Sequence, residues 1–479
     1  MKRNLSMLVD FYELTMANGL LDCPYKDTIV YFDMFFRNVP ENGGFAIMAG
    51  LDQLIEYINN INFTDEDIEY IRSFKIFDEK FIKFLSDFKF TCDVWAIPEG
   101  TPIFPHEPIV TVRGPAVQAL LIETVLLLTI NHQSLIATKA NRIVRAAQGR
   151  TVMEFGARRS HGYDSAVYGS RAAYIGGCDS TSNLEAARRF NIPPAGTMAH
   201  SWIQMFDDEY SAFKAYAEKY PNSCLLLVDT YNTLKSGIPN AIKVFNEVIV
   251  PKGYRPLGIR IDSGDITYLT KKARKMLDQA GFPDCMIIVS NSLDEYLIRD
   301  MLVQGARVDG FGVGERLITA SAEPVFGGVY KLSAIEDKSG RIIPKIKISD
   351  NISKLTIPGF KKTWRLFDRD SGKAIADLIT LHDEVVDESK PYELFDPIHT
   401  WKRKTVDSFI ARKLQRKIFD KGVQVYTSPS CEDIRKYCLQ QIDTLWEEVL
   451  RFENPHNYYV DLSQPLWDLR HELINEHKF

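Results

Sequence analysis

The sequence predicts an α/β protein whose central segment forms a parallel barrel, and three observations lead to this prediction. The chain has 479 residues, more than the ~250–300 residues that one hydrophobic core usually supports, so we expect two or three domains. Hydrophobic residues make up 45% and charged residues 25% of the chain, which excludes a mainly disordered or fibrous protein. Between residues 150 and 320, short β-rich runs alternate with helical stretches, as they do in parallel sheets.

The first 115 residues predict a mixed region of strands and helices. Thr28–Phe36 is rich in β-forming residues and is a predicted strand. Leu51–Asn59 and Asp65–Phe74 are predicted helices, because their apolar residues recur at helical spacing. Asp93–Arg113 holds short β-like runs separated by prolines, which predicts a small antiparallel sheet with tight turns.

The sequence favours a cytoplasmic protein that binds neither membranes nor nucleic acid. The most apolar run, Val117–Ile130, carries Gln118 and Glu123 and is too short to span a bilayer, so we expect a buried helix that begins after Pro115. The basic N-terminus is interrupted by acidic residues before any signal-peptide core can form. The net charge of −5 provides no bulk attraction for nucleic acid. The seven cysteines are scattered without a CxxC pair, which indicates a reducing compartment.

Seven short apolar runs are the predicted strands of the barrel. They are Val152–Phe155, Ala173–Gly177, Gly196–Ala199, Leu225–Val228, Leu257–Ile261, Met286–Val289 and Arg307–Val313. Three stretches between the later runs have helical periodicity: Asn240–Val250, Ile266–Gly281 and Leu293–Gly305. Seven such units fit a closed or nearly closed barrel better than a flat sheet.

The alternation ends near residue 340. Lys345–Leu355 is a predicted strand and turn, and the basic stretch Lys402–Lys421 is predicted to be the solvated face of a surface helix. Asp433–Phe452 and Leu466–His477 are predicted helices that pack back onto the N-terminal region. We therefore predict three segments, 1–115, 116–340 and 341–479, of which the last completes the first.

Polar residues follow the predicted barrel strands. Reactive residues of parallel barrels collect at the carboxyl ends of the strands. Here these ends carry, in chain order, Phe155, Gly156, Arg158, Arg159, Asp179, His200, Asp229, Arg260, Asp262, Asp265, Ser290, Asn291, Ser292 and Phe311–Glu315. So many polar ends on one rim are hard to explain by packing and predict a functional site.

Several of these motifs have a structural explanation beside the functional one. Phe311–Glu315 (FGVGE) is either a tight turn that needs glycine at positive φ or a backbone N–H cradle for a phosphate. Asp229 either caps a helix or accepts the imidazole N–H of His200. The segment Asp262–Asp265 (DSGD) either caps a helix, through Asp262 or Ser263, or offers two carboxylates beside an arginine that suit a sugar phosphate and its magnesium ion. His161, beside two arginines, is either structural or part of the site.

Nine motifs carry a resemblance to a known family. They occur in this order: DFYELTMANG, FDMFFRNVPENGGFAIMAGL, EFGARRSHG, GGCDSTSN, GTMAHSW, LLVDTYNT, GIRIDSGD, FGVGERL and GGVYKL. Each motif alone is modest, but the ordered set is highly specific. Through it the chain closely resembles the nicotinate phosphoribosyltransferases, which are type II phosphoribosyltransferases. The resemblance runs from about residue 8 to 365 and is weaker beyond.

The resemblance implies a fold and a reaction. The fold is an N-terminal α/β sandwich domain and an irregular seven-stranded parallel α/β barrel, with the C-terminal segment packing back. Such enzymes, classed as ligases, join nicotinate to 5-phosphoribosyl 1-diphosphate and release nicotinate mononucleotide and diphosphate, the first step of NAD salvage from nicotinate. They couple this reaction to ATP hydrolysis through a phosphohistidine, which is His200 here, and they use Mg²⁺. A homodimer with a shared active site is implied.

The resemblance also assigns roles to individual residues. The catalytic residues are His200, Asp229 and Asp262, and Asp262 is also the predicted metal ligand. The predicted nicotinate-binding residues are Phe155, Thr197, Arg260 and, from a partner subunit, Tyr12. The predicted phosphoribosyl- and diphosphate-binding residues are Arg37, Arg158, Asp179, Asn291, Gly314, Thr319, Lys345 and Lys347.

General chemistry agrees with these roles. Glycosyl transfer to a pyridine nitrogen passes through an oxocarbenium-like state, whose positive charge Asp229 and Asp262 would stabilise. The leaving diphosphate needs Mg²⁺ and basic groups. A guanidinium such as that of Arg260 binds a carboxylate bidentately, and neutral imidazole is nucleophilic near pH 7.

Three alternatives remain beside this assignment. Asp179 matches a position where nicotinamide-using relatives keep an aspartate for the amide, so it points elsewhere, pairs with an arginine, or signals nicotinamide. Thr197 and the GGVYKL motif favour nicotinate.

Quinolinate phosphoribosyltransferases are shorter and lack the histidine motif. A catalytically silent barrel that senses a nucleotide or phosphosugar predicts loss of key positions, yet His200, Asp229, Arg260 and Asp262 are all present.

Overall fold

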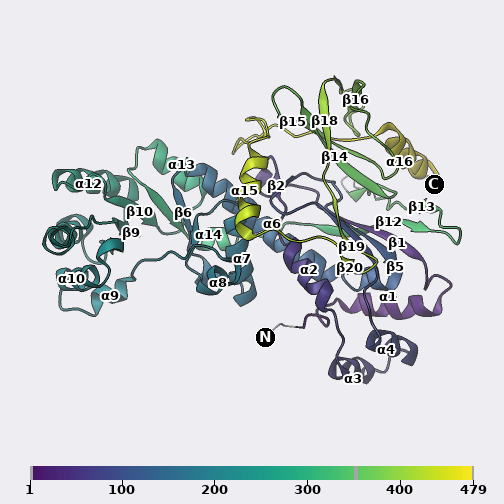
Figure 1. Ribbon diagram of the computed structural model, residues 1–479, viewed down its shortest axis with the longest axis horizontal. Coiled ribbons are helices and arrows are strands. Elements are labelled where there is room, and N and C mark those ends of the chain that lie inside the picture. Colours follow the sequence, from purple (N-terminus) through teal and green to yellow (C-terminus); the bar gives the residue numbers. More distant parts are fainter. Residues whose placement is uncertain (1–3, 350–353, 477–479) are drawn as a thin grey trace. The chain divides into compact units, whose positions relative to one another are not determined.

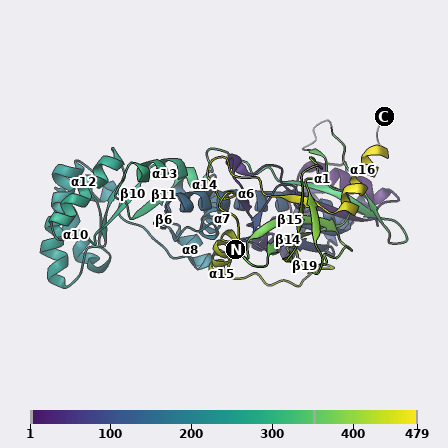
Figure 2. The same ribbon diagram turned by 90° about the horizontal axis from the view of Figure 1, so that it is seen from above.

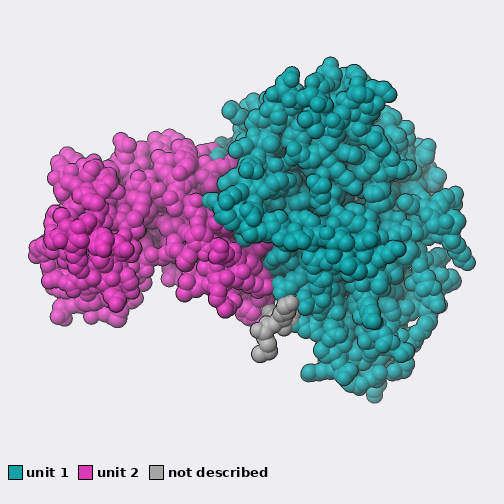
Figure 3. All heavy atoms as spheres, in the orientation of Figure 1, with its two compact units in different colours: residues 1–135, 325–479 teal, residues 136–324 magenta. Residues whose placement is uncertain are grey.

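The computed structural model describes residues 4–349 and 354–476. The chain divides into two compact units (Figure 3). Unit 1 consists of residues 1–135 and 325–479, and unit 2 consists of residues 136–324. The C-terminal segment therefore belongs to the same unit as the N-terminal region. The two units are divided after residues 135 and 324, whereas the sequence predicted boundaries after residues 115 and 340.

Unit 1 begins with helices that pack through apolar faces. Their bounds are α1 Phe11–Asp22, α2 Leu51–Asn60, α3 Asp65–Ser73, α4 Glu79–Ser86, α5 Ala116–Leu120 and α6 Glu123–Ala146, of which α6 crosses the division at residue 135. Helices α2 and α3 confirm the predictions from apolar spacing. Helix α3 starts at a capping box in which Thr64 and Asp67 exchange hydrogen bonds. Leu14, Ile68 and Phe81 share one buried apolar cluster that joins α1, α3 and α4.

The predicted buried helix after Pro115 is confirmed, as α5 followed by α6. By length and composition the run Ala116–Ala146 could cross a membrane. However, 67% of its most apolar window is buried inside the protein, as is usual for a core helix.

A seven-stranded antiparallel sheet forms the centre of unit 1, in the order β13-β12-β1-β5-β3-β19-β20 (Figure 1). The bounds are β1 Ile29–Phe35, β3 Asp93–Ala96, β5 Val110–Pro115, β12 Val329–Glu336, β13 Ile342–Pro344, β19 Arg416–Asp420 and β20 Val423–Gln424. Strand β1 confirms the strand predicted at Thr28–Phe36 and lies between β5 and β12. The antiparallel pairing of β3 with β5 confirms the sheet predicted within Asp93–Arg113.

A second sheet of unit 1 is built from the C-terminal segment, in the order β18-β14-β15-β21. The bounds are β14 Lys361–Asp368, β15 Ala374–Leu381, β18 Phe409–Lys413 and β21 Val460–Leu462. Two further pairs join β16 Tyr392–Phe395 with β17 Arg403–Val406 and β2 Ala46–Ile47 with β4 Pro102–Ile103. Helices α15 Cys431–Ile442 and α16 Gln464–Glu476 follow the predicted C-terminal helices, although α15 ends ten residues early and His477 lies outside the described residues.

Two predictions for the C-terminal segment are wrong. Lys402–Lys421 forms strands β17, β18 and β19 instead of a surface helix, because Val406, Phe409 and Ile418 are buried between exposed charges. The strand predicted at Lys345–Leu355 is absent from its described part, since β13 already ends at Pro344, and residues 350–353 lie outside the described residues.

A buried ion pair joins the two central strands of the second sheet. The Arg365 guanidinium on β14 donates to both carboxylate oxygens of Asp377 on β15, at 2.8 and 2.6 Å, and neither side chain is exposed. A third hydrogen bond from Arg365 reaches the Pro102 carbonyl on β4, at 2.9 Å. The Tyr458 hydroxyl donates to Asp377 at 3.0 Å. Burial beside the Asp377 carboxylate holds the pKa of the neighbouring Glu107 well above its usual range.

Unit 2 contains a six-stranded parallel sheet in the order β7-β6-β11-β10-β9-β8. The bounds are β6 Thr151–Glu154, β7 Ser180–Thr181, β8 Leu225–Leu227, β9 Gly258–Ile261, β10 Met286–Ser290 and β11 Gly310–Val313. Its helices, several of which flank the strands in Figure 2, are α7 Tyr163–Ile175, α8 Leu184–Phe190, α9 His200–Gln204, α10 Glu209–Lys219, α11 Ile238–Val244, α12 Ile266–Gln279, α13 Glu295–Val303 and α14 Glu315–Ile318.

Five of the seven predicted barrel strands are confirmed, and two are wrong. Ala173–Gly177 lies mostly within helix α7, and the strand comes just after it, as β7. Gly196–Ala199 is not a strand, although Pro194 forms a parallel bridge with Thr181 beside β7. The parallel α/β architecture is as predicted, and among the described residues no strand pairing closes the sheet between β8 and the segment around Pro194.

We expect Arg365→Met to destabilise unit 1 by about 3–5 kcal/mol, because it leaves the Asp377 carboxylate buried without its cation. The measurement is urea unfolding followed by tryptophan fluorescence, since every tryptophan except Trp202 lies in unit 1. The matched control is Arg403→Met, whose pair with Glu393 is about half exposed, so a loss of at most ~1 kcal/mol is expected. Equal losses in the two variants would contradict the role given to the buried pair.

Candidate active site

The candidate site lies at the carboxyl ends of three neighbouring strands of unit 2. Asp229 comes two residues after β8, Asp262 directly follows β9, and Ser290 is the last residue of β10. The strands are parallel and adjacent, so their carboxyl ends meet at one edge. The sheet thus brings together polar residues that are far apart in the sequence, as the pattern of polar strand ends predicted.

Arg260 is the centre of this cluster. Its Nε donates to the Ser290 hydroxyl at 2.8 Å, Nη1 donates to the Thr197 hydroxyl at 2.9 Å, and Nη2 donates to Asp262 Oδ1 at 2.8 Å. The Ser290 hydroxyl in turn donates to the same Asp262 oxygen. Among the described residues, no acceptor takes the second hydrogen of Nη1 or Nη2. Each of the three guanidinium nitrogens therefore makes one hydrogen bond within the site, and Nη1 and Nη2 each keep one N–H for a ligand.

His200 and Asp229 form a contact, as predicted. His200 Nε2 lies 3.2 Å from Asp229 Oδ1, and the other carboxylate oxygen accepts hydrogen bonds from the Asp262 backbone and the Ser263 hydroxyl. The Asp229 side chain is 1% exposed, whereas that of His200 is 39% exposed. A proton on Nε2 leaves the lone pair on Nδ1 of a partly exposed ring. His200 begins helix α9 rather than ending a strand, so that part of the prediction is wrong.

Phe155 and Gly312 are fitted to each other. Phe155 follows β6, and its backbone N–H donates to the Val313 carbonyl at 2.7 Å. A Cβ on Gly312 would lie 2.6 Å from two carbons of the Phe155 ring, so only glycine allows the ring this position. The Arg260 guanidinium carbon lies 5.7 Å from the centre of the same ring. The tight-turn explanation of FGVGE is wrong, because neither Gly312 nor Gly314 has positive φ.

Two loops beside the site are held to each other by side chains. Asn291 and Ser292, directly after β10, have positive φ values of 98° and 39°, which are strained for residues with a side chain. The Ser292 hydroxyl donates to Glu315 at 2.8 Å, at the start of α14. The Thr319 hydroxyl donates to the Glu315 carbonyl at 2.6 Å. The loops that carry Asn291, Gly314 and Thr319 are therefore fixed as one structure.

Some predicted site residues of unit 2 are not drawn into this cluster. The Asp179 carboxylate accepts a hydrogen bond from the Val152 backbone at 2.9 Å, and Asp179 precedes β7 instead of following a strand. It therefore lies toward the amino ends of β6 and β7, away from Phe155. Arg158 is exposed in the short turn after Phe155, and His161 is exposed as well.

The remaining predicted site residues lie in unit 1. Tyr12 is on α1 and is 45% exposed, and burial together with the neighbouring Glu123 carboxylate raises the pKa of its hydroxyl. Arg37 lines a cavity of about 1150 Å³ together with Arg451 and Arg470. The side chains of Lys345 and Lys347 are exposed after β13. The predicted residues thus form two sets, one in each unit.

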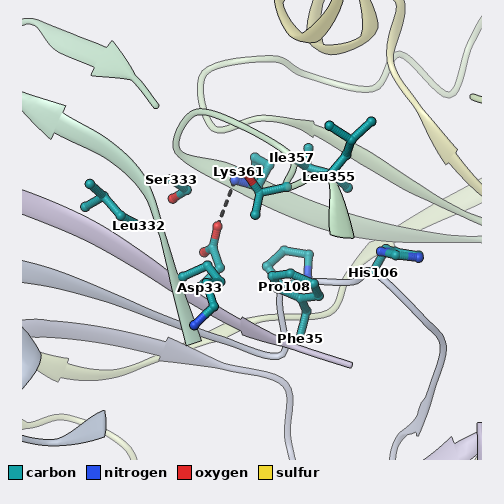
Figure 4. A pocket seen from close by; sticks show the side chains of 11 residues that line it. Asp33, Phe35, His106, Pro108, Leu332, Ser333, Leu355, Ile357 and Lys361 are labelled. Atoms are coloured by element: carbon teal, nitrogen blue, oxygen red, sulfur yellow. Dashed lines mark ion pairs between the residues drawn. The ribbon is translucent and has the colours of Figure 1, made fainter. Parts of the chain in front are cut away.

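A second, much smaller cavity of unit 1 does not belong to the candidate site. It measures about 10 Å³, close to what one water molecule needs, and is lined by Asp33, Phe35 and Lys361 among others (Figure 4). The Lys361 ammonium and the Asp33 carboxylate pair at 2.7 Å beside it, and both are buried. This pair neutralises two charges in the core of unit 1.

The carboxylates of the site can be compared with what a magnesium ion requires. Among the described residues, no group of three or more His, Cys, Asp or Glu side chains is placed to hold a metal ion. Asp262 is hydrogen-bonded through Oδ1, and its Oδ2 has no donor among the described residues. Mg²⁺ is commonly held by one or two carboxylates together with substrate phosphates. Asp262 therefore fits an ion that arrives with a diphosphate.

No binding role was predicted for Ser290 and Ser263, although Ser263 belongs to the GIRIDSGD motif and Ser290 follows a predicted strand. Ser290 joins Arg260 to Asp262, and Ser263 donates to Asp229. Their position at strand ends was visible in the sequence, but serines there are common caps, so nothing separated these two from the rest.

Comparisons with known proteins agree along the whole chain. Three family models match: the nicotinate phosphoribosyltransferase (NAPRTase) N-terminal domain at residues 7–131, the NAPRTase family at 151–383, and the nicotinate phosphoribosyltransferase C-terminal domain at 360–470. The nicotinate phosphoribosyltransferase of Bacillus subtilis (strain 168) is 45% identical over 475 residues, which cover 99% of this chain and 96% of that protein. The nicotinate phosphoribosyltransferase of Dictyostelium discoideum is 35% identical over 523 residues, which cover 98% of this chain and 88% of that protein.

Solved structures give the same result. The crystal structure of human nicotinic acid phosphoribosyltransferase matches with a TM-score of 0.86 at 28% identity, covering 97% of this chain and 99% of that one. The structure of a nicotinate-nucleotide pyrophosphorylase from Pyrococcus furiosus matches with a TM-score of 0.70 at 25% identity, covering 92% of this chain and 95% of that one. By sequence along nearly its full length and by fold, the chain belongs to the nicotinate phosphoribosyltransferase family.

Proposed function

We propose that the protein joins nicotinate to 5-phosphoribosyl 1-diphosphate, with ATP hydrolysis, to form nicotinate mononucleotide and diphosphate. The observation that supports this most directly is the Arg260 guanidinium, whose Nη1 and Nη2 each keep one N–H donor and whose central carbon lies 5.7 Å from the centre of the Phe155 ring. A pyridine ring stacked on Phe155 brings its carboxylate within reach of those donors. An enzyme whose substrate has a flat ring and a carboxylate needs this pair of groups.

The same cluster suits the transfer of the ribosyl group. The bond from the ribose carbon to the diphosphate breaks as the bond to the pyridine nitrogen forms, and positive charge develops on the ribose. The Asp262 carboxylate, half-buried beside Arg260, stabilises this charge. A magnesium ion held by Asp262 would supply charge neutralisation for the leaving diphosphate. The strained loop at Asn291 and the turn at Gly314 provide backbone donors for phosphate oxygens.

His200 is the proposed acceptor for the ATP γ-phosphoryl group. Its Nε2 is held by Asp229, so Nδ1 attacks the terminal phosphorus and ADP leaves. The buried Asp229 carboxylate stabilises the positive charge that the ring acquires. Hydrolysis of the phosphohistidine then consumes water and returns phosphate and the free ring.

The placement of Asp179 favours nicotinate over nicotinamide. An aspartate that accepts the amide of nicotinamide must face a ring bound at Phe155. Asp179 instead accepts the Val152 N–H near the amino ends of the strands. Of the three explanations left open for this residue, the one in which it points elsewhere fits best, and it causes no repulsion with a bound carboxylate.

The proposed site is shared between subunits of a homodimer. Tyr12 lies in unit 1 and is assigned to the site of the partner subunit, where it covers the pyridine ring opposite Phe155. Arg37, Lys345 and Lys347, also in unit 1, are the proposed diphosphate contacts. The compartment we infer is the cytoplasm, because no cysteine among the described residues forms a disulfide and six of the seven are buried as thiols.

The first prediction concerns substrate choice. With 5-phosphoribosyl 1-diphosphate, the protein should convert nicotinate to its mononucleotide far faster than it converts nicotinamide or quinolinate, because only nicotinate matches one carboxylate to the Arg260 fork. Mass spectrometry of the products, with and without ATP, measures this, and ATP should raise the yield. Asp179→Asn is the control and should leave the preference unchanged. Nicotinamide turnover at a comparable rate would overturn the substrate assignment, and no turnover of any of the three indicates a silent barrel.

The second prediction concerns His200. His200→Ala should abolish ATP hydrolysis and protein phosphorylation but leave a weak transferase that ignores ATP, since the groups that bind both substrates remain. Incubation with labelled ATP and a test for acid-labile, base-stable phosphate on the protein measures this. His161→Ala, at an exposed histidine, is the matched control and should be phosphorylated normally. Phosphate retained on the His200 variant would assign the acceptor role to another residue.

The third prediction concerns Tyr12. Tyr12→Ala should raise the KM for nicotinate by a few-fold to about tenfold, because an aromatic stack contributes ~0.5–1.5 kcal/mol beyond area burial. Tyr12→Phe keeps the ring and is the matched control, with little change expected.

Complementation tests the shared site directly. Tyr12→Ala and His200→Ala chains should each be poor alone, whereas mixed dimers should regain one site with both Tyr12 and His200. The readout is ATP-coupled formation of nicotinate mononucleotide after subunit exchange, which is verified separately with differently tagged chains. If exchange occurs and no activity returns, Tyr12 acts within its own chain.

A further inference from the structure

We propose that Glu154 is a positioning residue that fixes Phe155 at the nicotinate site. This inference rests on the proposed function. Glu154 is the last residue of β6, directly before Phe155, and its side chain is fully buried in unit 2. It stood in the EFGARRSHG motif, but neither the motif nor the proposed chemistry gives it a role.

The Glu154 carboxylate collects donors from three different elements. One oxygen accepts the backbone N–H of Gly156, just after Phe155. The other accepts the Thr181 hydroxyl on β7 at 2.6 Å and the Ser170 hydroxyl on α7 at 2.8 Å. The turn that carries Phe155 is thereby attached to the neighbouring strand and to the helix that covers it.

The alternation of side chains along β6 separates Glu154 from the site itself. Met153 and Phe155 share one apolar cluster with Leu225 and Ile288, which come from β8 and β10. Because successive side chains of a strand point to opposite faces, Glu154 points away from that cluster, toward Ser170 on α7. Glu154 therefore does not face a ligand bound at Phe155, and its effect on such a ligand is exerted through the turn that carries Phe155.

The turn after Phe155 has little freedom to adjust. A Cβ on Gly156 would lie 2.5 Å from the Ile318 Cβ and 2.8 Å from the Gly314 carbonyl oxygen, so the backbone there is in close contact with the β11 loop. On the other side, Gly312 lies directly against the Phe155 ring. A small shift at Gly156 must consequently move the ring, since the surrounding contacts leave no space.

The chemistry at this position requires a carboxylate. The Gly156 N–H and the Thr181 hydroxyl donate to this side chain, while the single hydrogen of the Ser170 hydroxyl has two acceptors at 2.8 Å, Glu154 and the Ala166 carbonyl. An ionised carboxylate offers acceptors only and so satisfies all of these donors. Burial raises the pKa of Glu154, and the three hydrogen bonds oppose that rise. A glutamine of nearly the same shape would place an N–H₂ group among donors and leave at least one of them unpaired.

The test compares Glu154→Gln with the wild type and with Phe155→Ala. We expect Glu154→Gln to raise the KM for nicotinate by about two- to tenfold, the range of a lost aromatic stack. The KM for 5-phosphoribosyl 1-diphosphate should rise less, because its proposed contacts Arg158 and Gly314 lie beside the same turn but are not stacked on by Phe155. The double variant Glu154→Gln with Phe155→Ala should have the same KM for nicotinate as Phe155→Ala alone. Thr181→Val and Ser170→Ala each remove one donor and should cause smaller rises, which keeps the test open if Glu154→Gln does not fold.

Two results would overturn the inference. One is an equal rise in both KM values, and the other is full additivity in the double variant, since either means that Glu154 does not act through Phe155. A crystal structure of Glu154→Gln supplies a readout independent of turnover, and a displaced Phe155 turn is expected there. If the wild type does not use nicotinate at all, the proposed function fails. The crystal structure of Glu154→Gln still tests whether Glu154 fixes the turn that carries Phe155.

Discussion

The candidate active site depends on one charge, the guanidinium of Arg260. It lies on β9 between Thr197 on one side and Ser290 on the other, and it neutralises Asp262, whose backbone N–H binds Asp229. Through Asp229 the same connection reaches His200. Each lost contact would leave a polar group unpaired, so this partly buried cation holds four chain segments in fixed positions relative to one another.

The central part of this arrangement could be predicted from the sequence, for a physical reason. Arg260 and Asp262 are two residues apart on and just after a strand, so their side chains share one face. The alternation of β-rich runs with helices predicted parallel strands, and parallel neighbours necessarily bring their carboxyl ends together. The contact of His200 with Asp229 was predicted from the same rule for a reason that is partly wrong, because the segment before His200 is not a strand and His200 begins helix α9.

Other parts of the fold could not be predicted, because local composition misled. Ala173–Gly177 has β-like residues, but it continues the apolar face of α7, and only the packing of the whole helix decides its state. In Lys402–Lys421 the many charges suggested a solvated helix, whereas buried residues such as Phe409 and Phe419 anchor strands in two different sheets. The placement of Asp179 and the contact of Gly312 with the Phe155 ring depend on strand register, which no local pattern specifies.

The discontinuity of unit 1 has a consequence for synthesis on the ribosome. Strand β1 lies between β5, which is translated soon after it, and β12, which is translated only after the whole of unit 2. Until then β1 presents an unpaired, apolar edge, the kind of surface that aggregates or is held by chaperones. Unit 2 is complete once residue 324 emerges, whereas unit 1 waits for the end of the chain. The part of the protein that is made first is therefore among the last to fold.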